Sequence, residues 1–280
     1  MPPSPHPRIH WAFTQRAGGV SGGHCAAVDH QPADKTAPPA DTASNRSFDN
    51  ETSGIESGGL NLGLNCDDDP AHVAINRQRV AQLIGQPVSW LTQVHGVEVL
   101  DSPDVLASPE ADAQISTRPG LALAVLVADC LPVLLADRQG RVIGAAHAGW
   151  RGLAGGVLDN TVARMQAHAP AADLVAWLGP SIGPTAFEVG DEVRAAFLSR
   201  HPEAADAFTP REKPGKWLAD LPGLARQRLL AAGVGEVLSA GACTWSDPAR
   251  FWSYRRDPRC GRMAGLIWLT PADEPSASTG

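Results

Sequence analysis

The chain has 280 residues, of which 43% are hydrophobic and 19% charged, with a formal net charge of −7 and a sequence pI of about 5.7. This composition is ordinary for a globular protein, and the acidic balance argues against a nucleic-acid partner. No apolar run approaches the roughly 20 residues that span a bilayer, and the start, MPPSPHPRIHWAF, lacks the charged-then-apolar order of a secretory signal.

The N-terminal quarter contains one strand and one long polar segment. Alternation over residues 8–14 (RIHWAFT) predicts a strand that ends at a glycine-rich turn. Residues 28–59 are almost devoid of large apolar side chains, so we expect a mobile inserted loop there. The C-terminal residues 271–280 have the same character and are expected to be a disordered tail. We therefore predict one domain over 1–280, with its core at about 8–270.

The middle of the chain alternates between helical and strand patterns. Asp69 and Pro70 are a helix-start pair, and the helix that they open is expected to end at Gly85. Residues 89–101 (SWLTQVHGVEVLD) predict two strands that are interrupted at His95 and Gly96. Residues 121–137 form a continuous apolar run, and Pro132 predicts that its strand breaks or bulges just after Cys130.

The remaining elements continue this mixed pattern. We predict strands at 141–150, 174–179, 236–242 and 264–269, and helices at 151–169, 190–201 and 216–233. Mixed strands and helices of this kind indicate sheets that are covered by helices.

The cysteines and histidines that stand out are the ones at strand ends. Five cysteines, an odd number without a CxxC pair, indicate free thiols and a cytoplasmic location rather than a disulfide framework. His95 and His147 each end an apolar strand, and Cys130 lies at the predicted strand break. A thiolate and two imidazoles can hold a catalytic zinc ion. The spacings of 35 and 17 residues match no short zinc motif, so a core cysteine and a Cys/His nucleophilic pair stay open beside the ligand interpretation.

Several arginines flank glycine turns and suggest a site for an anionic or polar substrate. Arg151 stands where a strand gives way to a helix, and Arg16 precedes a double glycine. Further candidates for substrate binding are Asp129, Glu188, Tyr254, Arg255 and Arg256. A solvated surface is the alternative for each single arginine, and a favourable helix N-terminal position is the alternative for Glu188.

These residues fall in ordered blocks that resemble the YfiH/DUF152 family. The blocks include TQRAGGVSGG, TQVHG, ADCLPVLLAD, AAHAGWRG, LGPSIGPTAFEVG and CGRMAGLIWL. They span about residues 8–270, interrupted by the 28–59 segment. Members of the family have been labelled variously as multicopper polyphenol oxidase, peptidoglycan editing factor and purine nucleoside phosphorylase.

The resemblance implies a fold, a cofactor and an activity. The fold would be a single α+β domain, a four-layer α/β/β/α sandwich with mixed sheets. Zinc would be held by His95, Cys130 and His147, which would be catalytic together with Arg16. The substrates would be a purine nucleoside and phosphate, bound by a monomer that phosphorolyses adenosine, inosine, guanosine and methylthioadenosine and also deaminates adenosine.

Two departures and three rival functions accompany this resemblance. Family members usually carry a histidine and a glycine where this chain has Asn65 and Cys66, and the inserted segment separates two family blocks. A hydrolase that edits peptidoglycan precursors is the main alternative, and a binding module without turnover is another. A multicopper oxidase is disfavoured, because nine histidines without a His-x-His pair are a poor set for several coppers.

Overall fold

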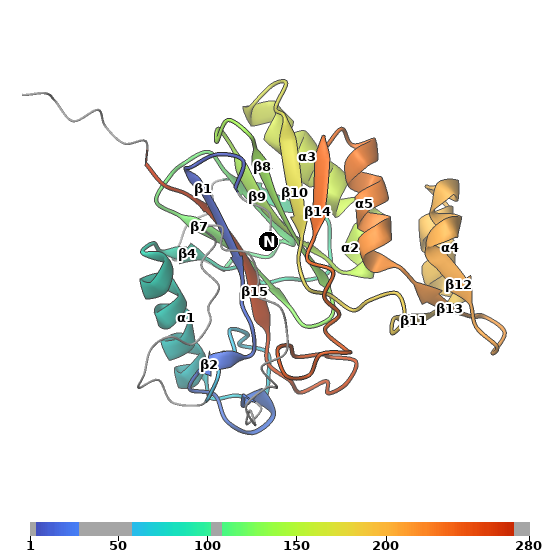
Figure 1. Cartoon of the computed structure of the whole chain (residues 1–280), viewed down its shortest axis with the longest axis horizontal. Helices are drawn as coiled ribbons and strands as arrows, with labels where there is room; N and C mark the ends of the chain where they lie inside the picture. Colours follow the sequence, from blue (N-terminus) through green and yellow to red (C-terminus); the bar gives the residue numbers. More distant parts are fainter. Residues whose placement is uncertain (1–3, 28–57, 102–107, 272–280) are drawn as a thin grey trace, which may run out of the picture.

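Two mixed sheets form the centre of the molecule (Figure 1). The structure, a computed structural model, describes residues 4–27, 58–101 and 108–271. The first sheet has the order β1 (Ile9–Phe13), β15 (Met263–Leu269), β7 (Ala122–Val127), β4 (Val88–Ser89). The second has the order β14 (Glu236–Ser239), β10 (Leu174–Leu178), β8 (Leu131–Asp137), β9 (Ile143–Ala148), β6 (Ala113–Ser116), β5 (Val99–Asp101). Both combine parallel and antiparallel neighbours.

Helices cover the outer faces of the two sheets. The first sheet is covered by α1 (Pro70–Ile84), whose Val80 belongs to the same buried cluster as Ala124 and Leu266 of the sheet. The second is covered by α2 (Trp150–Gly155), α3 (Val157–His168) and α5 (Leu221–Ala231). The expected fold class, an α+β domain with mixed sheets in four layers, is thus confirmed. No helix among the residues that the structure describes has the length and apolar character needed to cross a membrane.

Smaller elements lie beside this sandwich. A three-stranded sheet has the order β11 (Glu188–Gly190), β13 (Lys216–Ala219), β12 (Phe208–Pro210), and it lies next to α4 (Asp191–Leu198). A short pair joins β2 (Ala17–Gly19) to β3 (Gly58–Gly59), and two 3-10 helices, η1 (Gly23–Cys25) and η2 (Pro202–Ala207), complete the described elements.

The apolar runs of the sequence are explained by strands that are buried on both faces. In β8, Leu131, Val133 and Leu135 face the helices, whereas Leu134 packs between the two sheets. All seven residues of β8 are buried. A strand with two buried faces needs apolar residues on both faces, so the usual alternation is absent from Leu131 to Ala136.

The apolar run 121–137 is interrupted, as predicted, but the interruption is at residues 128–130 and so includes Cys130 instead of following it. Residues 128–130 form the turn, and Pro132 is the second residue of β8. Pro132 lies opposite His147 in β9, whose N–H donates to the carbonyl of Asp112 on the other side. That pair therefore uses no N–H from Pro132, so the proline removes no bond to β9.

Three other predicted elements are shorter or divided. The two strands expected in 89–101 are reduced to β4 and β5, and an irregular segment joins them. The helix expected over 151–169 is divided at Gly156, whose φ of 104° only glycine adopts readily. The helix expected over 216–233 begins only at Leu221, because Lys216–Ala219 pair as β13 and the side chain of Asp220 caps α5.

The ends of the first predicted helix agree with the structure, whereas the strands predicted at 141–150 and 236–242 end earlier, at Ala148 and Ser239. Asp69 caps α1, whose first residue is Pro70, and Gly85 ends it with a φ of 72°. Of the predicted loop 28–59, Gly58 and Gly59 form β3, which corrects its boundary, and 28–57 lie outside the described residues. Residues 272–280 of the predicted tail also lie outside them, so loop mobility and tail disorder stay predictions.

The turn after β8 is held by a buried carboxylate, and its removal is expected to destabilise the protein. Asp137 accepts hydrogen bonds from Arg141 Nε at 2.6 Å and Nη2 at 3.0 Å. Although burial raises the pKa of Asp137, these bonds outweigh burial and hold that pKa below its usual value. We expect Asp137→Ala to lower the free energy of unfolding by about 2 kcal/mol at pH 7, measured by urea denaturation.

The pH dependence of this effect has a definite sign. Because the folded pKa of Asp137 is lowered, its stabilisation is present above the roughly 3.9 of an unfolded aspartate and is lost as the pH falls through the folded value. The difference between wild type and Asp137→Ala should therefore shrink below about pH 4. Exposed Asp206 provides a control, since Asp206→Ala should change stability by less than about 0.5 kcal/mol. A difference that grows in acid would contradict this account.

Candidate metal centre

The fold brings His95, Cys130 and His147 together, although His95 lies in an irregular segment and not, as the sequence predicted, at the end of a strand. His95 lies in the segment between β4 and β5, Cys130 in the turn before β8, and His147 in β9. Their ligand atoms all lie within 4.8 Å of one another, with Cys130 Sγ 3.8 Å from His95 Nε2. The two imidazole rings are nearly perpendicular, at 81°, with centroids 4.8 Å apart. His95 is exposed and His147 is buried, so the group reaches from the core to the surface.

A buried carboxylate, Asp112, organises this group from behind. Its Oδ1 lies 2.7 Å from His147 Nδ1, and its two oxygens accept the backbone N–H groups of Val94, His95 and Gly96 at 3.1, 2.9 and 2.6 Å. With Nδ1 engaged, the Nε2 atom of His147 is available as a ligand. The three backbone bonds hold His95 in a left-handed conformation, φ 61°, that non-glycine residues rarely adopt.

The electrostatics of the group favour a thiolate. Burial alone would raise the pKa of Cys130, but the charge of His147 and hydrogen bonds from both histidines lower it to about 6. Burial likewise opposes the charge on His147, whereas Cys130 and Asp112 raise the pKa of His147 to about 9. These interactions favour the thiolate form of Cys130, which is the form that binds metals.

A glycine keeps the space beside the three side chains free. A Cβ atom at Gly149 would lie 2.9 Å from His95 Cδ2 and 3.1 Å from Cys130 Sγ. Both distances are too short for an ordinary contact, so any larger residue at 149 would push the ligands apart. Gly149 is also the N-cap residue of α2, which begins with Trp150 and Arg151.

The group opens into a cavity of about 630 Å³. Aromatic and apolar side chains on its wall include Leu126, Trp150, Ile182, Phe187 and Tyr254. Four arginines also line it, namely Arg77, Arg151, Arg255 and Arg262. All four lie over aromatic rings: Arg77 over Trp90 at 4.5 Å, Arg151 over Trp150 at 4.4 Å, Arg255 over Phe187 at 5.5 Å, and Arg262 over Tyr254 at 5.6 Å. The cavity therefore joins flat apolar surfaces to positive charge.

Four of the predicted substrate-binding residues line this cavity. Arg151, Tyr254 and Arg255 have exposed side chains on its wall. Asp129 also lines the cavity, and its φ is 86°. The Asp129 carboxylate accepts bonds from Thr244 Oγ1 at 2.5 Å, Ser253 Oγ at 2.9 Å and the backbone N–H of Arg255 at 2.7 Å. It thus holds the segment that presents Tyr254 and Arg255.

The other three predicted residues lie outside the lining of this cavity. Arg16 donates to the carbonyls of Pro248 at 2.8 Å and Ala26 at 2.7 Å, and it lies over the Trp252 ring. Arg256 donates to the carbonyls of Thr244, Trp245 and Phe251, all within one loop. The Glu188 carboxylate pairs with Arg211 at 3.4 Å on the surface. In this structure all three therefore tie loops or strands together.

Sequence reasoning missed several residues of the site. These include Asp112, Gln93, Arg77, Trp150 and Arg262. Asp112 precedes the apolar strand residues Ala113 and Ile115, and a charged residue at the start of a buried strand is a signal that was available. The side-chain amide of Gln93 bonds to the backbone of β7 as a neighbouring strand would: it donates to the carbonyl of Leu126 and accepts from the Leu126 N–H. No sequence pattern marks such a side chain.

The residues present fit a metal ion. Two imidazole nitrogens and one thiolate leave an open fourth position in tetrahedral coordination, which is the arrangement of catalytic zinc sites. The Asp112 carboxylate bonds to the second ring nitrogen of His147, as a carboxylate commonly does with metal-binding histidines. Within residues 4–27, 58–101 and 108–271, this is the only such group of three histidine, cysteine or acidic ligands.

Comparison with known proteins places the chain in a family. The family model described as multi-copper polyphenol oxidoreductase laccase matches residues 10–270. The chain belongs to this family, also called YfiH/DUF152. A YfiH/DUF152 relative from Pseudomonas aeruginosa, named purine nucleoside phosphorylase, is 52% identical over 210 residues, covering 75% of this chain and 86% of the relative. A purine nucleoside phosphorylase from Escherichia coli, YfiH, is 50% identical with the same coverage.

Two solved structures share the fold. A Neisseria meningitidis protein of this family superposes with a TM-score of 0.80 at 42% identity, covering 95% of this chain and 97% of that one. YlmD from Geobacillus stearothermophilus superposes with a TM-score of 0.77 at 28% identity, covering 95% and 94%. The resemblance drawn from the sequence blocks is thus confirmed at the level of family and fold.

Proposed function

We propose that this chain is a zinc-dependent phosphorylase of purine nucleosides. One observation carries the proposal: the His95, Cys130 and His147 group opens into a cavity whose walls also carry four arginines. The relatives named purine nucleoside phosphorylase support it. A volume of about 630 Å³ lies in the range that accommodates a small organic ligand. A purine nucleoside offers a flat base for the aromatic walls, and phosphate offers charge for the arginines.

Each part of the cavity has a role in this reaction. The ring of Trp150 or Tyr254 stacks on the purine, because such rings offer flat apolar area to bases. Arg151, Arg255 and Arg262 bind phosphate and turn one of its oxygens toward the anomeric carbon of the ribose. That oxygen forms a new C–O bond as the C–N bond breaks, and the purine leaves with the bonding electrons and takes up a proton. Zinc bound by His95, Cys130 and His147 supplies a Lewis acid beside these groups.

The same cavity is proposed to deaminate adenosine. In that reaction water replaces the amino group of the purine, giving inosine and ammonia. The open coordination position of the three-ligand set supports this second reaction, since such sites accept more than one oxygen ligand. Inosine formation from adenosine without phosphate, followed by chromatography, tests it. Absence of inosine from protein that phosphorolyses other nucleosides would restrict the proposal to phosphorolysis.

The proposed phosphorolysis is tested by hypoxanthine release from inosine. Protein with its metal content measured is incubated with inosine in the presence and absence of phosphate. We expect hypoxanthine only with phosphate. Release that is independent of phosphate would instead identify a hydrolase, and no release from fully metallated protein would overturn the proposal. Release of an amino acid from a UDP-linked muramyl intermediate would favour the peptidoglycan-editing alternative.

The multi-copper description of the family does not suit the ligands that this chain offers. Multicopper centres require many histidines, generally in His-x-His pairs, and the nine histidines here contain none. Across the described ranges, the one candidate group supplies three ligands, which suffice for one ion. Elemental analysis that found several coppers per chain would contradict this interpretation.

Arg151 provides a specific test of how phosphate is bound. We expect Arg151→Ala to raise the KM for phosphate by about tenfold, because it removes one charge-assisted contact, with a smaller effect on the KM for inosine. Arg151→Lys should recover part of the loss, since it keeps the charge without the guanidinium fork. Initial rates at varied phosphate measure both. Equal increases in the two KM values for Arg151→Ala would contradict a phosphate-specific role.

A further inference from the structure

The turn that carries the proposed ligand Cys130 also carries a carboxylate that binds a distant part of the chain. Asp129, which directly precedes Cys130, is only 8% exposed. Its Oδ1 accepts a hydrogen bond from Thr244 Oγ1 at 2.5 Å. Its Oδ2 accepts from Ser253 Oγ at 2.9 Å and from the backbone N–H of Arg255 at 2.7 Å. Both carboxylate oxygens are therefore engaged by the protein itself.

The backbone of Asp129 is also unusual. Its φ of 86° lies in the left-handed region, which glycine adopts readily and which asparagine and aspartate adopt more often than other residues. The carbonyl of Asp129 accepts the N–H of Ile182 at 2.9 Å, and Ile182 lines the cavity. The side-chain and backbone bonds together offset the cost of this conformation.

The segment 253–255, which the carboxylate holds, leads from the core to the cavity. Ser253 is buried, whereas Tyr254 and Arg255 have exposed side chains on the cavity wall. The chain turns at this point, because the carbonyl of Ser253 accepts the N–H groups of Arg256 and Asp257 at 3.1 and 2.9 Å. Inside this turn, the N–H of Arg255 points to the Asp129 carboxylate as its acceptor. Removal of that carboxylate would leave the N–H without this bond.

The position of the segment 253–255 also determines where two arginines of the cavity stand. The guanidinium of Arg255 donates from Nη1 to the carbonyl of Glu188 at 3.0 Å and lies over the Phe187 ring. Arg262 lies over the ring of Tyr254. Both arginines belong to the three that are proposed above to bind phosphate. A shift of the segment would therefore displace one of these arginines and remove the aromatic support of the other.

We propose that Asp129 is a positioning residue whose carboxylate holds the segment 253–255, and with it the phosphate-binding arginines, at a fixed place beside Cys130. The inference rests on the phosphorolysis proposed above and assigns one residue within it. Direct binding of phosphate by Asp129 is unfavourable, because two anions repel each other. Asp129 instead acts through its hydrogen bonds to the protein, so its shape and acceptors matter more than its charge.

Two substitutions at this position separate positioning from a direct role of the charge. Asp129→Gly keeps the left-handed φ and removes all the side-chain acceptors. Asp129→Asn also suits this φ, and it can keep all three contacts. Its amide oxygen can replace Oδ2, and its NH2 group can donate to the hydroxyl of Thr244, because a hydroxyl accepts as well as donates.

Steady-state kinetics of the zinc-loaded variants with inosine and phosphate test the proposal. We expect Asp129→Gly to raise the KM for phosphate by at least about tenfold and to change kcat less, because it displaces binding groups. Asp129→Asn should remain within about threefold of wild type. Asp247→Ala is the matched control, since the Asp247 carboxylate bonds to Arg250 in the same part of the chain and neither residue lines the cavity. It should leave both KM values unchanged.

Three results would overturn the positioning role. Equal losses in Asp129→Asn and Asp129→Gly would show that the charge itself is required. A fall in kcat with an unchanged KM for phosphate would place Asp129 in the chemical step. Loss of zinc from Asp129→Gly, measured by elemental analysis, would show that the substitution acts through Cys130.

Hydrogen exchange provides a readout that does not depend on turnover. In zinc-loaded protein without substrate, peptides that cover 253–257 should exchange at least about tenfold faster in Asp129→Gly than in wild type or Asp129→Asn. Unchanged exchange in Asp129→Gly would overturn the inference even if the protein phosphorolyses inosine. If wild type releases no hypoxanthine, the proposed function fails, and the exchange rates still decide whether Asp129 holds the segment.

Discussion

Cys130→Ser is expected to abolish metal binding and turnover together. Serine has nearly the same size as cysteine, but its hydroxyl stays protonated at neutral pH and is a poor zinc ligand. Metal content should fall from about one ion per chain to background after dialysis against a chelator. The rate of phosphorolysis should fall by more than about 100-fold, which is the largest usual effect of removing a residue that only hydrogen-bonds to a metal ligand. Elemental analysis and the hypoxanthine assay measure the two effects.

The control for this substitution is Cys243→Ser. Cys243 is also partly exposed, and its Sγ accepts the N–H of Gly183 at 3.2 Å, a bond that a serine hydroxyl can replace. It should retain metal and activity. Full zinc content in Cys130→Ser would remove Cys130 from the ligand set, and retained zinc with lost turnover would favour the alternative in which Cys130 is a nucleophile.

Asp112→Asn is expected to weaken metal binding, although it replaces none of the three proposed ligands. The carboxylate accepts three backbone N–H groups and pairs with His147 Nδ1, whereas the amide of asparagine would turn an N–H group toward one of these donors. Zinc affinity should fall by about 10- to 100-fold, because the orientation of His147 and the turn at His95 both depend on this group. Competition with a chromogenic chelator measures the affinity.

The same substitution should also destabilise the apoprotein. A buried donor that loses its acceptor costs about 1–3 kcal/mol, so urea denaturation should show a loss in that range. Asp101→Asn is the matched control, since the Asp101 carboxylate pairs with His168 and is partly exposed. It should leave zinc affinity unchanged. If Asp112→Asn bound zinc as tightly as wild type, Asp112 would have no role in orienting the ligands.

The elements that the sequence predicts well are those with local signals. In α1, Asp69, Pro70 and Gly85 set both ends by capping and by backbone geometry. In β8 and β9, long apolar runs reflect burial on both faces. By contrast, the sequence of β13 was predicted to be part of a helix. It forms a strand because it pairs with β11 and β12, which lie elsewhere in the chain. Local propensity cannot reveal a partner of that kind.

The residues of the candidate site also fall into those that the sequence predicts and those that only the fold reveals. His95, Cys130 and His147 are recognisable as a set through the family blocks, and the structure brings them together. Asp112 lies opposite His147 only because β6 pairs with β9, so its role depends on sheet register. Arg77 and Arg262 reach the cavity wall from α1 and from the start of β15, and neither shows any pattern in sequence that points there.

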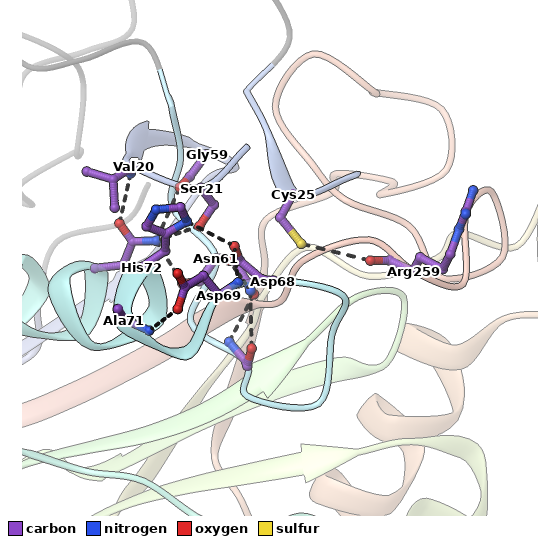
Figure 2. A network of polar contacts seen from close by, with 12 residues as sticks. Val20, Ser21, Cys25, Gly59, Asn61, Asp68, Asp69, Ala71, His72 and Arg259 are labelled. Carbon is purple, nitrogen blue, oxygen red and sulfur yellow. Dashed lines mark hydrogen bonds and ion pairs between the residues drawn. The ribbon is translucent and has the colours of Figure 1, made fainter. Parts of the chain in front are cut away.

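The inserted segment leaves the metal centre and the sheets intact. Family blocks on both sides of it pair with each other, because β2, which precedes η1 and the segment, joins β3 as an antiparallel pair. Asn76 from α1 fixes this junction, because it bonds the Val20 N–H and the Gly59 carbonyl at 3.0 and 3.2 Å. Val20 and Gly59 are labelled in Figure 2. An insertion at such a closed junction adds length without displacing the strands that carry the ligands.

Identification of the sugar product of inosine by phosphorus NMR tests the central proposal most directly. Zinc-loaded protein is incubated with inosine and inorganic phosphate, and the phosphorus spectrum is followed as hypoxanthine appears. Our account predicts a ribose phosphate ester that forms in equal amount to hypoxanthine and is absent with Cys130→Ser. Free ribose with all phosphate remaining inorganic, or no hypoxanthine at all from protein holding one zinc per chain, would contradict it.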